Sequence, residues 1–399
     1  MNALGRSKTA DLWVVRGDAS VTATQMAKRL SMSMDTIDWR GVDPYDGLLS
    51  PVARALRGRA TRQMLLQAVR RSPLNLRALL RIPPRRMAAT TGLAASATAR
   101  LAGDPFWECQ LSRLGRWTAQ GQIAHGPHQG LWGYEFDVQT RWGFYAAKTP
   151  NVVATSFAAH GCLDAQALRG KELERLGQGL LRNLWRGEFF AYTPQSTVLI
   201  HNANLLGAAL AGRLSATGQL DDGLRSDLRS AAVMGAGTTL RHQRADGSWP
   251  YGDSKGLDWV DGFHTVYNLL SLDRLMWLLE SDAEKAIDRG ARFYFDHLFR
   301  DGIPLYYPDR SSGPSDINNV ATGLRGAVWG ARRGKVPDHL PGRVFEYLVA
   351  AFWDASGYFR AAANRWKPSA KLNFPRWGAA PALDALSTLI AWHRGGSCL

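Results

Sequence analysis

The chain has 399 residues, 45% hydrophobic and 21% charged, a composition typical of globular proteins that excludes a mainly disordered chain. No apolar run reaches the roughly 18–20 residues of a membrane-spanning helix, and the first residues lack the apolar core of a secretory signal. The three cysteines, Cys109, Cys162 and Cys398, are far apart, which argues against a disulfide framework or a cysteine zinc site. We therefore expect a cytoplasmic protein without a metal or cofactor.

The net charge of +15 is concentrated near the N-terminus, where residues 1–103 carry 17 Lys and Arg against 6 Asp and Glu. Eleven arginines and no acidic residue lie between Arg54 and Arg100. Such a run attracts a polyanion, and the candidates are an anionic membrane face, an acidic glycan and a lipid-pyrophosphate. An anionic membrane face would place the protein peripherally at the inner membrane. A merely solvated basic face is the alternative. Nucleic acid is not expected, because no nucleic-acid motif accompanies the charge.

An internal repeat organises the chain from residue 105 onward. Aromatic loops precede stretches that begin polar and become apolar, and the marker residues Tyr134, Tyr192, Tyr251, Tyr307 and Tyr358 are separated by 58, 59, 56 and 51 residues. Between these markers lie amphipathic stretches predicted as helices at 170–186, 223–242, 283–298 and 341–354, and a further one at 105–120 precedes the first marker. Each step therefore reads as loop, helix, loop, helix.

Two kinds of helix alternate in this repeat. The first of each pair is apolar on all sides and rich in Ala, Gly and Ser, whereas the second is half charged. An inner ring of buried helices inside an outer ring satisfies both patterns, so we predict an all-α (α/α) toroid of about six helical hairpins. The Arg-rich segment 51–82 is a candidate for the sixth inner helix. An open α-solenoid is the alternative.

The predicted domain organisation follows from this repeat. Residues 1–50 form an N-terminal extension that packs on the toroid, and residues 51–399 form the toroid itself, with 51–103 as its Arg-rich first segment.

The inner helices of a toroid begin at one mouth, so the aromatic loops before them are expected to line one cavity. Aromatic faces stack on sugar rings, and polar groups bind sugar hydroxyls, which points to a carbohydrate. The predicted substrate-binding residues are Trp132, Tyr134, Arg141, Trp142, Tyr192, Asn202, Asn204, Trp249, Trp259, Tyr306, Asn318, Arg376 and Trp377. For the two asparagines of HNANLLG, hydrogen bonds to loop backbone are the alternative, and for Arg376 an ion pair with Asp384.

Candidate catalytic groups occur in three of these loops. They are Glu135, Asp137, Tyr251, Asp258, Asp261, His264 and Tyr307. Glu135 and Asp137 share one face if the segment is strand-like and form a potential acid/base pair, or else Asp137 pairs with Arg141 and fixes the loop. His264 beside carboxylates is a candidate general base, or else Asp261 only caps a helix and His264 is structural.

Several segments resemble the bacterial VpsJ-type polysaccharide-biosynthesis proteins, which are found with exopolysaccharide and capsule genes. The matching segments are VDPYDGLLS (42–50), SPLNLRALLRI (72–82), WGYEFDVQTR (132–141), TPNVVAT (149–155), NANLLGA (202–208), DGSWPYG (246–252), WVDGFHT (259–265) and PRWGAAP (375–381). The resemblance covers residues 40–393 and implies an (α/α) toroid and a role in surface glycan assembly. Some members carry a delta-aminolevulinic acid dehydratase label, which does not fit, because that enzyme is a TIM barrel.

A looser resemblance links the chain to D-glucuronyl C5-epimerases and uronate lyases. It implies His264, Tyr251 and Tyr307 as proton-transfer groups, and Arg141 or Arg376 as the group that neutralises a carboxylate.

Three functions remain open on the sequence alone. The first is an enzyme that modifies a polysaccharide or lipid-linked oligosaccharide by hydrolysis, elimination or epimerisation. The second is a non-catalytic glycan-binding or scaffold subunit of a polysaccharide synthase complex. The third is a terpenoid cyclase-like toroid, since aromatic rings also stabilise carbocations.

Overall fold

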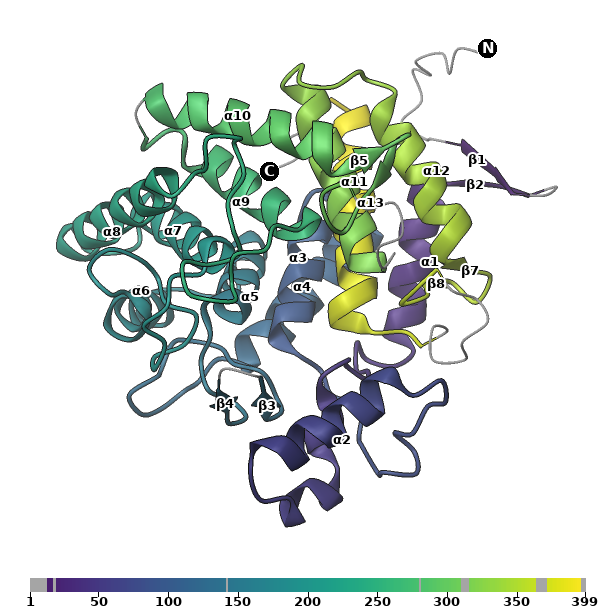
Figure 1. Cartoon of the computed structure of the whole chain (residues 1–399), viewed down its shortest axis with the longest axis horizontal. Helices are drawn as coiled ribbons and strands as arrows, with labels where there is room; N and C mark the ends of the chain where they lie inside the picture. The colour runs from purple at the N-terminus through teal and green to yellow at the C-terminus, as the bar shows by residue number, and fades with distance from the viewer. Residues whose placement is uncertain are drawn as a thin grey trace.

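The computed structural model describes residues 13–16, 19–140, 143–279, 281–309, 316–363 and 372–395. Within them, six helices form an inner ring (Figure 1). They are α3 (Ala88–Ala99), α5 (Val152–Asp164), α7 (His201–Ser215), α9 (Gly262–Leu275), α11 (Ile317–Arg332) and α13 (Ala380–His393). Each contacts the next, and α13 returns to contact α3, so the ring closes. The predicted toroid is therefore confirmed, and the open solenoid is excluded.

Six further helices surround this ring. They are α1 (Ala23–Asp35), α4 (Pro105–Gln120), α6 (Lys171–Leu184), α8 (Asp222–Arg241), α10 (Ser281–His297) and α12 (Leu340–Phe352). The last five match the predicted amphipathic stretches within a few residues. In α6, Leu173, Leu176, Leu180 and Leu184 are buried at intervals of three and four, as a helix lying on a core requires.

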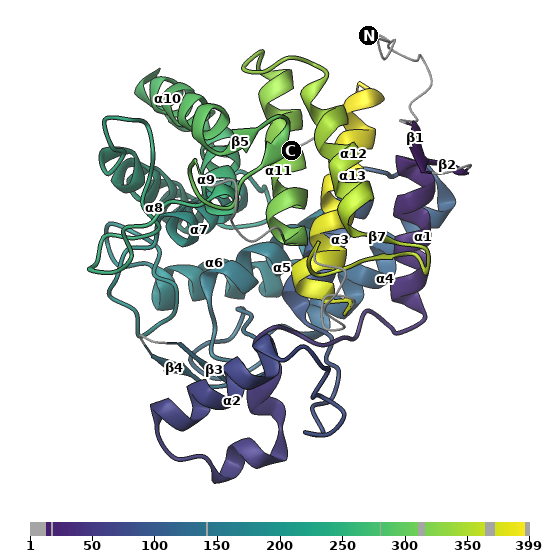
Figure 2. The same cartoon turned by 45° about the vertical axis from the view of Figure 1, so that its right-hand side comes forward.

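The sixth hairpin joins distant parts of the chain, because α1 packs on α13 (Figure 2). The segment 1–50 therefore contributes an outer helix of the ring through α1. The first inner helix is α3, and not the Arg-rich segment 51–82, which forms the short helix η2 (Pro51–Ala55) and the helix α2 (Arg59–Arg71) outside the ring. Another short helix, η1 (Asp46–Leu49), precedes this segment. The last turn before α13 is a π-helical turn, η4 (Pro375–Ala379).

Small residues allow the inner helices to approach closely. All residues of α7 except Arg213 are buried, and seven of its positions are Ala, Gly or Ser. Gly92 of α3 faces Phe157 and Ala158 of α5, so that a β-carbon at this position would collide with the α5 backbone. Side-chain volume at these crossings therefore sets the diameter of the ring.

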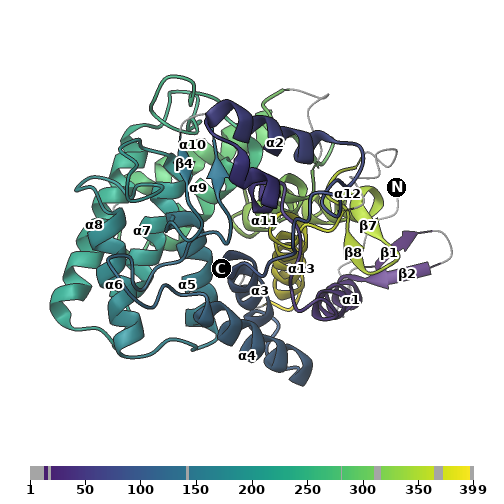
Figure 3. The same cartoon turned by 90° about the horizontal axis from the view of Figure 1, so that it is seen from below.

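The part of the chain that the structure describes also contains four two-stranded antiparallel hairpins: β1 (Trp13–Arg16) with β2 (Ala19–Thr22), β3 (Val138–Gln139) with β4 (Phe144–Tyr145), β5 (Phe299–Arg300) with β6 (Ile303–Pro304), and β7 (Trp353–Asp354) with β8 (Tyr358–Phe359). The β3–β4 hairpin and α2 lie together at one end of the ring (Figure 1), and Figure 3 shows the molecule from this end. No helix among the described residues is long and apolar enough to cross a membrane.

The close crossing of α3 and α5 can be tested with Gly92→Ala. We expect this substitution to lower the free energy of unfolding by about 1–3 kcal/mol, because the added methyl group overpacks the ring. Gly342→Ala is the matched control, because Gly342 also lies in a helix, α12, but has no atom within 4 Å of an added β-carbon. Urea unfolding of both variants measures the difference, and equal stabilities would contradict the proposed close packing.

Candidate functional site

A cavity of about 380 Å³ lies at the N-terminal ends of the inner helices. Aromatic rings form most of its wall, and its polar lining side chains include Asp261, His264 and Arg376. Of the predicted site residues, the cavity is lined by Tyr134, Tyr192, Asn202, Tyr251, Trp259, Asp261, His264, Tyr306, Tyr307, Asn318, Arg376 and Trp377. The aromatic loops therefore converge on one space.

The chemical centre of the cavity is the pair formed by Asp261 and His264. Asp261 is the N-cap of α9, where its Oδ1 accepts the His264 backbone N–H at 3.0 Å. Its Oδ2 lies 2.7 Å from His264 Nδ1 and accepts the Trp259 indole N–H at 3.2 Å. The two readings of Asp261 from the sequence are thus compatible, because one carboxylate oxygen caps the helix while the other binds the imidazole.

This arrangement determines which nitrogen of His264 faces the cavity. The Asp261 side chain is 2% exposed and holds the proton on Nδ1, whereas the His264 side chain is 20% exposed. The structure gives Nε2 no hydrogen-bond partner among the residues it describes. His264 therefore presents a basic nitrogen to whatever occupies the cavity.

Stacked rings support this pair. Tyr251 lies parallel to Trp259 with ring centroids 4.5 Å apart, and its ring is 4.7 Å from that of His264. Burial, followed by the charge of Asp261, raises the pKa of Tyr251 above its ordinary value. The Tyr251 phenol is consequently protonated at neutral pH and can donate a hydrogen bond or a proton.

The part of the wall around Phe263 is also aromatic. Phe263 makes edge-to-face contacts with Tyr306 and Trp377, at centroid distances of 5.7 and 6.1 Å, and Tyr306 packs against Tyr307 at 4.8 Å. Burial, and then the charges of Asp316 and Asp261, raises the pKa of Tyr306. This side of the cavity therefore presents neutral rings and hydroxyl groups.

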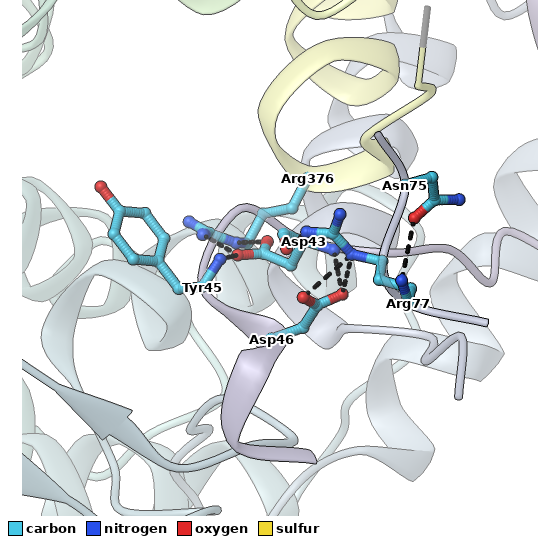
Figure 4. A network of polar contacts seen from close by, with 6 residues as sticks. All are labelled: Asp43, Tyr45, Asp46, Asn75, Arg77 and Arg376. Carbon is cyan, nitrogen blue, oxygen red and sulfur yellow. Dashed lines mark hydrogen bonds and ion pairs between the residues drawn. The ribbon is translucent and has the colours of Figure 1, made fainter. Parts of the chain in front are cut away.

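A buried ionic network fixes Arg376 at the edge of the cavity (Figure 4). Its guanidinium donates to both oxygens of Asp43, at 2.7 and 2.9 Å, and lies over the Tyr134 ring at 4.9 Å. The Asp43 carbonyl in turn accepts from Arg77, whose Nε binds Asp46. The charge of Arg376 is therefore neutralised by Asp43 and not by Asp384, which pairs with Arg100 and Arg325.

The two asparagines of HNANLLG occupy different environments. Asn204 is fully buried, where its Oδ1 accepts the Phe190 N–H at 2.9 Å and its Nδ2 donates to Gly235 O at 2.7 Å and to Thr239 Oγ1 at 2.9 Å. Asn202 lines the cavity, and its buried Oδ1 has no hydrogen-bond partner in the described part of the chain. Asn204 is thus structural, and Asn202 is poised for a ligand.

Several other predicted site residues lie away from the cavity. Trp132 and Trp249 are core residues, and their indole N–H groups donate to Thr118 O and Thr239 O. The remaining corrections concern carboxylates. Glu135 lies in a separate surface hollow with Lys148, Asp137 accepts the Ala147 N–H and fixes the β3–β4 hairpin, and Asp258 is exposed. Arg141 and Trp142 fall outside the described residues.

Other lining residues were not anticipated. Tyr45 reaches the cavity from the segment before η1, and Phe157, Phe263 and Tyr267 reach it from the inner helices. Tyr45 and Asp43 belong to the motif VDPYDGLLS, which carried part of the family resemblance but no predicted site residue. A smaller adjoining cavity of about 200 Å³ shares Tyr134, Tyr192 and Tyr251 with the larger one.

Asp316 is a further carboxyl group close to the site. It is the N-cap of α11, where Oδ1 accepts the Asn319 N–H at 2.9 Å, and it hydrogen-bonds with Trp377 of the cavity wall. Burial raises the pKa of Asp316 to about 6, against the lowering effect of these hydrogen bonds. The described residues contain no group of three or more His, Cys, Asp or Glu side chains that could hold a metal ion.

The closed double ring of helices, with a cavity at the N-terminal ends of the inner helices, defines the class of six-hairpin (α/α) toroid proteins. Solved structures with this fold match the chain. A sugar epimerase from a ruminal bacterium matches with a TM-score of 0.57 and 11% identity, over 78% of this chain and 88% of that one. The unsaturated glucuronyl hydrolase from Bacillus sp. GL1 matches with a TM-score of 0.56 and 14% identity, over 91% and 95%. A polysaccharide lyase matches with a TM-score of 0.56 and 10% identity, over 93% and 96%.

These structural matches establish that the chain shares its fold with carbohydrate-active enzymes. Because the sequence identities are low, the matches show nothing about the reaction of this chain. No protein-family model and no curated protein sequence matches the chain. The resemblance to the VpsJ-type proteins therefore stays a prediction.

The contrast between the two asparagines gives a direct test. We expect Asn204→Ala to lower the free energy of unfolding by about 2–4 kcal/mol, because it leaves buried partners such as the Phe190 N–H and Gly235 carbonyl unpaired. We expect Asn202→Ala to cost less than about 1 kcal/mol, because no hydrogen bond of its Oδ1 is lost. Urea unfolding measures both values, and a similar cost for the two variants would refute the distinction.

The raised pKa of Asp316 predicts a pH dependence of stability. Between about pH 4 and pH 6 the folded state binds more protons at this carboxyl than the unfolded state, so its contribution to stability falls as pH rises through this window. Asp316→Asn keeps a helix-capping side chain but removes the titration. We expect the variant to gain about 2 kcal/mol over the wild type between pH 4 and pH 7. Parallel stability profiles of the two proteins would show that Asp316 has an ordinary pKa.

Proposed function

We propose that this protein binds a glycan in the central cavity and modifies it by proton transfer. The observation that supports this most directly is the Asp261–His264 pair, which directs a basic nitrogen into an aromatic-walled cavity. A histidine oriented by a carboxylate is suited to general base catalysis at neutral pH.

Two features favour a carbohydrate as the ligand. Tyr251 and Trp259 form a stacked aromatic face, which suits the C–H face of a sugar ring. Asn202 has an unpaired buried oxygen at the cavity wall, and a half-turn of its amide presents either its donor or its acceptor to the cavity. A sugar hydroxyl, which both donates and accepts, can satisfy that amide.

The charges of the cavity favour one kind of chemistry over another. Hydrolysis of a glycosidic bond usually requires two carboxyl groups on opposite sides of that bond. Among the described residues of the lining, Asp261 is the only carboxylate, and it is bound to His264. Proton abstraction by His264 with Tyr251 as donor, as in epimerisation or elimination, is therefore better supported than hydrolysis.

The same network bears on the nature of the sugar. Arg376 was a candidate for neutralising a uronate carboxylate, but Asp43 already occupies two of its donors. A neutral sugar, or an acidic one whose carboxylate lies toward another part of the mouth, fits this arrangement better. A role in surface glycan assembly, as the VpsJ-type resemblance implies, is part of the proposal.

A panel of neutral and acidic polysaccharides and oligosaccharides tests the proposal. Purified protein should produce solvent-deuterium uptake or an unsaturated sugar, detected by NMR and ultraviolet absorbance. Glycan binding without any turnover would favour the non-catalytic scaffold function. Turnover of a polyprenyl diphosphate in place of every glycan would point to a terpenoid cyclase.

The role of His264 predicts a specific loss of turnover. We expect His264→Gln to reduce kcat by roughly 10²–10⁴-fold, because general base catalysis contributes a factor of that size. Glycan affinity should change much less, since the aromatic wall is intact. His125→Gln is the control, because His125 is exposed on a loop outside the cavity. Unchanged kcat in the His264 variant, with steady-state kinetics on the same substrate, would exclude His264 as the base.

A further inference from the structure

The arginine lobe, which we define as residues 51–86, is the most strongly charged part of the molecule. It contains ten arginines and no Lys, Asp or Glu. Four of the arginines have partners within the structure. Arg77 binds buried Asp46, and Arg62, Arg70 and Arg86 lie over the rings of Phe144, Tyr45 and Trp117 at 4.4, 5.0 and 3.8 Å. Seven of the ten arginines are exposed: Arg54, Arg57, Arg59, Arg70, Arg71, Arg81 and Arg85.

The same lobe exposes large apolar side chains. Val52 is 51% exposed, Met64 71%, Leu74 61% and Leu79 80%. Other residues pack the lobe against the rest of the protein, since Leu66 and Val69 of α2 are buried against Gly47 of η1. The exposed apolar residues are therefore surplus to the fold, and leaving them in water is unfavourable.

The lobe lies beside the mouth of the cavity. Helix α2 contacts β3, and Val138 of β3 lines the cavity. Arg70 of the lobe lies over the ring of Tyr45, a cavity-lining residue, at 5.0 Å. Figures 1 and 2 show the lobe extending from the ring at this end. A surface that binds the lobe would consequently lie next to the cavity entrance.

We propose that the arginine lobe docks on an anionic lipid bilayer, with its arginines at the headgroups and its exposed apolar side chains in the interface. Basic residues are attracted to anionic headgroups, and aliphatic side chains gain by leaving water for the acyl boundary. A soluble polyanion, such as an acidic glycan, would satisfy the arginines only. The apolar side chains are thus the observation that favours a membrane.

Docking in this way would bring the cavity mouth to the membrane surface. If the proposed glycan activity is correct, on which this step rests, the substrate class is a glycan carried on a membrane lipid. The membrane docking itself does not depend on that activity, so its test uses no glycan.

Vesicle co-sedimentation tests the docking. Full-length protein should sediment with vesicles that contain phosphatidylglycerol and much less with pure phosphatidylcholine. Each basic residue at an anionic surface contributes roughly a fivefold factor in partitioning. We therefore expect the combined variant Arg57→Ser, Arg59→Ser, Arg71→Ser and Arg81→Ser to bind anionic vesicles at least tenfold more weakly.

Two matched controls separate docking from net charge and from misfolding. The combined variant Arg169→Ser, Arg175→Ser, Arg182→Ser and Arg292→Ser removes the same charge from exposed positions outside the lobe and should bind like the wild type. Leu74→Ser with Leu79→Ser should weaken binding severalfold, whereas Val233→Ser with Met234→Ser, at exposed positions on α8, should not. Circular dichroism and thermal unfolding confirm that each variant is folded.

Three outcomes would overturn the proposal. One is the absence of wild-type binding to anionic vesicles at low salt. Another is equal weakening by the lobe variants and their controls, which would indicate a general effect of charge. The third is that the leucine variant binds normally while a soluble acidic polysaccharide displaces the vesicles, which would identify a polyanion as the partner. If the wild-type protein binds anionic vesicles but turns over no glycan, the result would count only against the proposed enzymatic function.

Discussion

The candidate site depends on two linked buried ion pairs, Asp43 with Arg376 and Asp46 with Arg77. Asp43 and Asp46 are almost fully buried, so each carboxylate requires its arginine, and removing one partner would leave an uncompensated charge in the protein interior. The pairs connect the segment before η1, the lobe and the turn that leads into α13 (Figure 4). They therefore hold Tyr45 and Trp377 against each other, with ring centroids 6.3 Å apart, at one side of the cavity.

Much of the fold could be predicted from the sequence, because it follows from local periodicity. The tyrosine spacing marked the hairpins, and the contrast between apolar and half-charged helices separated the inner ring from the outer one. The source of the sixth outer helix could not be predicted in the same way. This helix is α1, and its packing against α13 joins residues more than 340 positions apart, a contact that no local pattern records.

The site was predictable only in part, for a related reason. Motif density drew attention to the segment that holds Asp261 and His264, both of which line the cavity. It could not distinguish Trp249 from Trp259, which follows it in the same loop region. Trp249 is buried in the core, whereas Trp259 lines the cavity. Neither could it separate Asn204 from Asn202. The two residues are only two positions apart on α7, but Asn204 is buried against α8 whereas Asn202 lines the cavity. Tyr45 and Asp43 were missed because they lie outside the repeat.

The pairing of α1 with α13 has a consequence for how the chain is made. During synthesis α1 emerges first, but the helix that buries its apolar face, including Met26, Leu30 and Met34, emerges last. Until then this face must be shielded by other means or remain in contact with water. Contacts of such large sequence separation slow folding, and a partly made chain with an open ring exposes aggregation-prone surface. A chaperone that engages the nascent N-terminal helix would address this delay.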